Sequence, residues 1–162
     1  MGMSPRAHLA YGYDLGGAED FKAAERDEYG SPKLPWFPDD DSEVDDFGSE
    51  AEKILLASAG FAEEWTPAAA KAGYYDRKRD AEKRCGVELD TSGHYDHCGW
   101  VLIAKGSEQS VEWSQVMALD SAEMQRRPAA EGWDAKLRDA LTALGITPTQ
   151  DGPKWLVYPS YG

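Results

Sequence analysis

The stretch VELDTSGHYDHCGWVLIA, residues 87–104, decides the fold that the sequence predicts. Apolar and polar side chains alternate at its start, Ser92 and Gly93 are typical of a turn, and the residues from Gly99 to Ala104 form an apolar run. This pattern predicts a β-hairpin. Because the second strand is apolar on both faces, we expect it to lie in the centre of a sheet.

Three further segments are expected to supply strands to this sheet. Residues 6–15 place apolar or aromatic side chains at every second position, which is typical of a half-buried strand. Residues 111–119 alternate in the same way, and residues 154–158 form a last strand before Pro159. Together with the hairpin, these segments predict an antiparallel sheet of about four or five strands.

Helical spacing and helix-end residues occur between these strands. Ser49 and Glu52 form a capping box with Ser49 as the N-cap. Pro67 is suited to the first position of a helix, and Gly86 is suited to its end. The expected helices cover residues 49–60, 67–85 and 133–144, with shorter helical patterns at 18–28 and from Asp120 to Pro128.

The predicted fold class is therefore α+β, with an antiparallel sheet of about four or five strands and three helices packed on it. We expect a single domain over residues 1–162, because this length fits one domain. Residues 17–48 are predicted to form a long acidic loop insertion in that domain.

The net charge of −13 is concentrated in one part of the chain. Residues 14–52 carry 14 acidic and 3 basic side chains. This sign disfavours direct binding to nucleic-acid phosphates. The longest apolar run, Trp100 to Ala104, is far shorter than the roughly 20 residues of a membrane span, so no membrane partner is expected. With no apolar signal region near Met1, the protein is expected to be intracellular.

An acidic-aromatic segment, residues 35–46, is the main candidate binding site. Two aromatic residues between prolines precede a run of acids, and such a pair can fill a partner's apolar pocket while the acids steer toward a basic surface. Two interpretations stay open, because the aromatics can instead pin the loop to the protein's own core and the acids can form a solvated face. The candidate partner-binding residues are Trp36, Phe37, Asp39, Asp40, Asp41, Glu43, Asp45 and Asp46.

A cluster of thiols and imidazoles in the hairpin region gives an alternative. Cys85, His94, His97 and Cys98 are residue types that bind zinc or act in nucleophilic catalysis. The adjacent His97 and Cys98 point to opposite faces of a strand, however, which is poor spacing for a shared metal ion. We expect both cysteines to be free thiols, and we expect no cofactor and no catalytic residue that can be assigned. The alternative function is a metal-binding domain or a hydrolase built on these four residues.

Both ends of the chain resemble a phage protein family. The opening Ala10-Tyr-Gly-Tyr-Asp-Leu-Gly-Gly and the closing Pro153-Lys-Trp-Leu, with a long acidic middle, are similar to small uncharacterised proteins of actinobacterial tailed phages. The resemblance implies a phage setting in the host cytoplasm and no known activity. The sequence thus predicts a soluble, non-enzymatic accessory protein whose acidic-aromatic segment binds a host or phage protein with a basic surface, with imitation of nucleic acid as one form of that role.

Overall fold

The computed structural model describes residues 4–94 and 97–161, apart from residues 38–45. The α+β class is confirmed, with six strands and five helices in the described residues. The strands are β1 (Pro5–Gly17), β2 (Asp20–Phe21), β3 (Val87–His94), β4 (His97–Ala104), β5 (Gln109–Glu112) and β6 (Lys154–Tyr161). The helices are α1 (Phe47–Ser58), α2 (Pro67–Lys71), α3 (Tyr74–Cys85), α4 (Ser121–Ala130) and α5 (Trp133–Leu144).

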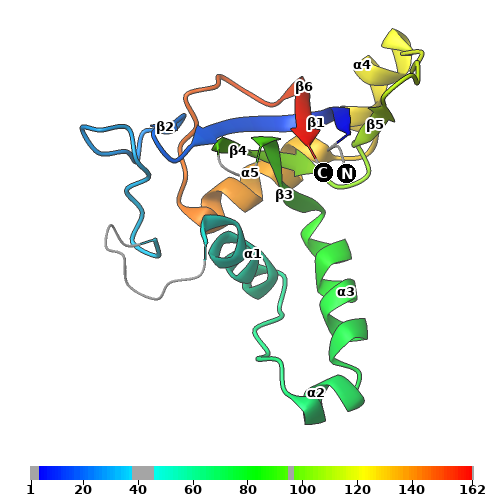
Figure 1. Cartoon of the computed structure of the whole chain (residues 1–162). Coiled ribbons are helices and arrows are strands. Elements are labelled where there is room, and N and C mark those ends of the chain that lie inside the picture. Colours follow the sequence, from blue (N-terminus) through cyan, green and yellow to red (C-terminus); the bar gives the residue numbers. More distant parts are fainter. Residues whose placement is uncertain (1–3, 38–45, 95–96, 162) are drawn as a thin grey trace.

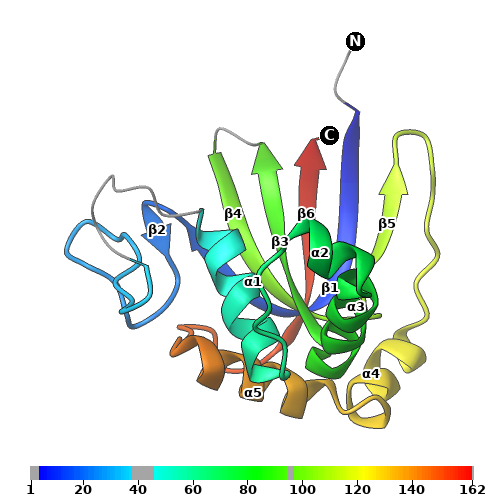
Figure 2. The same cartoon turned by 90° about the horizontal axis from the view of Figure 1, so that it is seen from below.

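The sheet closes on itself through the long strand β1. Residues 5–12 of β1 pair with β6, and residues 12–17 pair with β4. Strands β4 and β3 form the predicted hairpin, and β3 meets β6 at the pair Gly93 and Ser160. The pairings therefore form a closed cycle from β1 through β4, β3 and β6 back to β1 (Figure 2). Strands β2 and β5 also pair with β1 but lie outside this cycle.

The expectation of a purely antiparallel sheet is wrong, because β3 and β6 run in the same direction. A parallel pair needs a long crossover connection, and here the chain passes through β4, β5, α4 and α5 before it returns as β6. Alternation along a strand shows which residues are buried but says nothing about the direction of its neighbour.

The two faces of the sheet have separate apolar clusters. Helices α1, α3 and α5 lie on one side of the sheet (Figure 1). On that side Leu102 and Ala104 belong to the main core together with Trp133 of α5. Val101 and Ile103 point to the other side, which we call the inner face, and are buried in a smaller cluster. Strand β4 is thus buried on both faces, as its apolar run predicted.

Several predicted helix boundaries need correction. Asp46, rather than Ser49, caps α1, because its side chain accepts a hydrogen bond from the Ser49 backbone nitrogen at 2.9 Å. The predicted helix over 67–85 is broken at Gly73, whose φ of +85° interrupts the helix between α2 and α3. Helix α4 continues past Pro128. The break at Gly73 divides one predicted helix into two, and the short pattern from Asp120 forms α4, which gives five helices in place of the three predicted to pack on the sheet.

Two other predicted segments differ from the structure. Residues 18–28 do not form a helix; the strand β2 and a bridge between Ala23 and Pro148 replace it. The strand predicted over 111–119 ends at Glu112 as β5, and Ser114 has a φ of +68° that breaks the extended conformation. In the part of the chain that the structure covers, no helix has the length and apolar character needed to cross a membrane.

Candidate functional site

The aromatic half of the acidic-aromatic segment is anchored in the protein's own core. The indole nitrogen of Trp36 donates a hydrogen bond to the Leu144 carbonyl oxygen at 2.7 Å. The ring centroids of Trp36 and Phe37 lie 5.3 and 5.5 Å from that of Phe47 at the start of α1. Both side chains are only partly exposed. Of the two interpretations left open for these aromatics, the contacts favour the intramolecular one.

The acidic run lies between two anchored points. Phe37 precedes the run in the sequence and Phe47 follows it, and the rings of these two core residues are in contact. The last acid of the run, Asp46, is described and caps α1. The other acids proposed to bind a partner, Asp39, Asp40, Asp41, Glu43 and Asp45, lie outside the described residues.

The structure does not bring the four thiol and imidazole residues together. Cys85 ends α3 beside the start of β3, whereas His94 and His97 are cross-strand partners at the other end of the hairpin. At the rise of a β-strand these ends are roughly 23 Å apart. Cys98 pairs with Gly93, and both cysteines are free thiols. No group of three or more metal-binding side chains is found in residues 4–37, 46–94 and 97–161.

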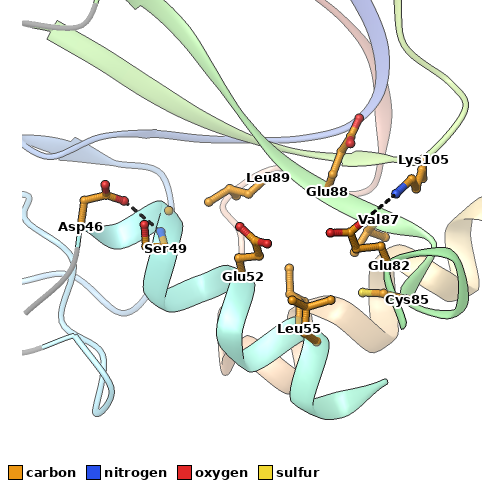
Figure 3. Close-up of a pocket in the computed structure, with 12 residues that line it drawn as sticks. Asp46, Ser49, Glu52, Leu55, Glu82, Cys85, Val87, Glu88, Leu89 and Lys105 are labelled. Carbon is orange, nitrogen blue, oxygen red and sulfur yellow. Dashed lines mark hydrogen bonds and ion pairs between the residues drawn. The ribbon is translucent and has the colours of Figure 1, made fainter. Parts of the chain in front are cut away.

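A groove on the helix side of the sheet adjoins the acidic segment instead. It encloses about 410 Å³ between α1, the end of α3, the start of β3 and the residue after β4 (Figure 3). Its wall is apolar and its rim is charged. We call it the acidic groove; it is lined by Asp46, Gly48, Ser49, Glu52, Leu55, Leu56, Glu82, Cys85, Val87, Glu88, Leu89 and Lys105.

The charges around the acidic groove form an incomplete network. The Lys78 ammonium lies 2.8 Å from a Glu52 carboxylate oxygen and 3.7 Å from Glu82, and Lys105 lies 4.0 Å from Glu82 (the last pair is drawn in Figure 3). Asp46 has no ion pair within the described residues, and the Glu88 side chain points away from the groove (Figure 3), to the face of the sheet that carries its cross-strand partner Ile103. Three carboxylates, those of Asp46, Glu52 and Glu82, thus face two ammonium groups, so the groove keeps an excess of negative charge.

Burial alters two titratable groups near the groove. Desolvation raises the pKa of Glu88 above its ordinary value; the Lys105 charge partly offsets this rise, and the carboxylates of Asp90, Glu108 and Glu82 add to it. Desolvation also raises the pKa of the Cys85 thiol, which therefore stays protonated at neutral pH.

We expect Cys85 to react slowly with iodoacetamide in the folded protein at pH 8. The reactive species is the thiolate, and burial of the thiol lowers its population. Peptide mapping by mass spectrometry would compare the alkylation rate of Cys85 in buffer and in urea, where the raised pKa is lost. Equal rates in the two solutions would contradict the burial of this thiol in the groove wall.

Sequence patterns did not indicate the acidic groove. Its carboxylates Glu52 and Glu82 come from α1 and α3, and each is unremarkable among its own charged neighbours. The only sequence signal near it is the acidic run that ends at Asp46.

Comparisons of this chain with protein-family models, with curated proteins and with solved structures gave no match.

Proposed function

We propose that this chain is a phage-type accessory protein that acts in the host cytoplasm by binding a host or phage protein with a basic surface. The proposed contact consists of the acidic segment 39–46 and the acidic groove beside it. The observation that carries the proposal is the excess of carboxylates in a groove that begins at Asp46, the last residue of that segment. Binding through these groups requires no catalytic chemistry.

The two parts of the contact have different expected roles. The acids of the segment would steer a cationic partner over a distance of about one Debye length, roughly 10 Å, and so increase the association rate. The groove is large enough to take a Lys or Arg side chain, whose apolar stem would lie against Leu55 and Leu89 while its charge meets Asp46 or Glu52. If the partner's basic surface normally binds nucleic acid, the same acids would occupy that surface in place of the nucleic acid.

The test is affinity capture from an actinobacterial host lysate, followed by affinity measurement with the purified captured protein. A groove variant carrying Glu52→Gln and Glu82→Gln is expected to raise Kd at least about tenfold and to reduce its salt dependence. A matched control neutralises two exposed carboxylates that do not line the groove, Glu19 and Asp139, and is expected to bind like the parent.

A segment variant separates the two parts of the proposed contact. Neutralising Asp39, Asp40, Asp41, Asp45 and Asp46 as asparagines keeps a good N-cap for α1, because asparagine caps helices as well as aspartate does. We expect this variant to slow association at low salt more than it speeds dissociation. An unchanged Kd in both the groove variant and the segment variant would refute the proposed function.

A further inference from the structure

A second polar cluster lies on the inner face of the sheet, opposite the helices. His8 of β1, Tyr158 of β6 and Ser160 of β6 share this face with the buried Ala10. Glu108 reaches the same cluster from the turn between β4 and β5. The carboxylates that face the acidic groove, Asp46, Glu52 and Glu82, do not belong to it, whereas Glu88 lies on this inner face beside Ile103 and its charge acts on Tyr158. The cluster therefore needs a separate explanation.

The histidine of this cluster uses both ring nitrogens. His8 Nδ1 lies 2.7 Å from a Glu108 carboxylate oxygen, and His8 Nε2 lies 2.7 Å from the Ser160 hydroxyl oxygen. A carboxylate can only accept a hydrogen bond, so Nδ1 carries the proton when the ring is neutral. Nε2 then accepts the hydrogen bond of the Ser160 hydroxyl. This is the proton arrangement in which an imidazole can act as a base toward a serine.

Neighbouring groups hold the imidazole in place. The Tyr158 ring stacks on His8 with a centroid distance of 5.0 Å and an angle of 9° between the planes. Tyr158 is itself fixed, because its hydroxyl donates a 2.6 Å hydrogen bond to Asp90. Desolvation, with added repulsion from the Asp90 charge, raises the pKa of Tyr158, so its hydroxyl keeps its proton. The His8 ring therefore has one orientation, which a catalytic base requires.

The line of three residues is partly exposed to solvent. The His8 side chain is 12% exposed and that of Glu108 is 34% exposed, and Ser160 is partly buried. Arg6 is the cross-strand partner of Ser160, and its guanidinium is hydrogen-bonded to the Glu112 carboxylate. A shallow position of this kind suits a small substrate.

We propose that Ser160 is a catalytic nucleophile, that His8 is its general base and that Glu108 positions His8, so that the inner face transfers acyl groups from small carboxylic esters. The Ser160 oxygen forms a bond to the ester carbonyl carbon while its proton passes to His8 Nε2. The bond to the leaving alcohol then breaks, and that proton goes to the alcohol oxygen. In the second half of the reaction, His8 takes a proton from water while the water oxygen bonds to the acyl carbon. The bond between that carbon and the Ser160 oxygen then breaks, the acid is released, and the proton on His8 returns to Ser160.

The test uses the whole chain and p-nitrophenyl acetate. We expect release of p-nitrophenolate together with one acetyl group per chain, mapped by mass spectrometry to Ser160. Ser160→Ala removes this label. His8→Ala is expected to slow labelling at least about 100-fold, the lower range for loss of a general base, and added imidazole is expected to restore part of the rate. A purely structural role of His8 would not give rescue by imidazole.

Control variants keep the inference falsifiable. Ser110 is the cross-strand partner of His8 on β5, so Ser110→Ala is a matched control that should label like the parent. Glu108→Gln should slow labelling, and Glu108→Asp should recover part of it, since Glu108 acts only through His8. Acetyl groups found on lysines alone, or equal labelling of the Ser160→Ala variant, would overturn the inference. Neither result bears on partner binding at the acidic groove.

Discussion

Replacement of Gly12 by alanine is expected to cost about 3 kcal/mol or more in free energy of unfolding, which is enough to leave much of a marginally stable domain unfolded. Gly12 is the residue at which β1 changes partner, and it pairs with both Ile103 and Lys154. A Cβ atom there would lie 1.9 Å from the Leu102 carbonyl oxygen and 2.8 Å from the Ile103 Cα. Both are backbone atoms of a buried strand, so neither can move aside without opening the sheet.

Gly152 provides a matched control for this substitution. A Cβ atom at Gly152 would meet nothing within 4 Å, and Gly152 is not among the glycines with positive φ. Gly152→Ala is therefore expected to leave stability unchanged or to raise it by about 0.4–1 kcal/mol. Urea unfolding followed by tryptophan fluorescence would measure both variants. If Gly12→Ala unfolded at the same urea concentration as Gly152→Ala, β1 would not cross β4 as closely as described.

Local patterns were sufficient for the elements that depend on local contacts. The hairpin of β3 and β4, the strand β1 and the helix α5 with its end at Gly145 were all predicted from alternation, helical spacing and glycine. Closure of the sheet was not, because it depends on a close approach between Gly12 and Leu102, which are distant in the sequence. The strand predicted over 111–119 was drawn too long for a related reason: Trp113 and Val116, which lie beyond the end of β5, are 74% and 95% exposed, so apolar character there does not reflect burial.

The candidate sites show the same difference between local sequence signals and contacts that form only in the folded chain. Charge is a local property, so the acidic run was visible in the sequence, whereas its anchoring through Trp36 and Phe37 depends on contacts with Phe47. The four thiol and imidazole residues are close in sequence, but the hairpin separates Cys85 from the two histidines by its own length. Conversely, His8 and Ser160 are at opposite ends of the chain and meet only because β1 and β6 are neighbours.

Replacement of Phe47 by alanine is expected to lower the free energy of unfolding by about 3–5 kcal/mol. Phe47 is 1% exposed, and its ring contacts four other aromatic rings. Trp100 of β4 stacks on it with a centroid distance of 4.2 Å, and Phe21 lies 5.8 Å away. Alanine would therefore leave a cavity between α1, the sheet and the start of the acidic run. Trp113→Ala, at a side chain that is 74% exposed, removes a larger ring and is expected to have little effect.

The milder variant Phe47→Leu connects this anchor to the proposed function. Leucine fills much of the cavity, so the chain should remain folded at low temperature, but it loses the ring contacts with Trp36 and Phe37 on the other side of the acidic run. If partner binding depends on holding the two ends of that run together, Kd should rise in Phe47→Leu while its Cys85 alkylation rate stays low. A raised Kd with fast alkylation would instead indicate that the groove itself has opened. An unchanged Kd would mean that the aromatic contacts stabilise the fold without positioning the acids.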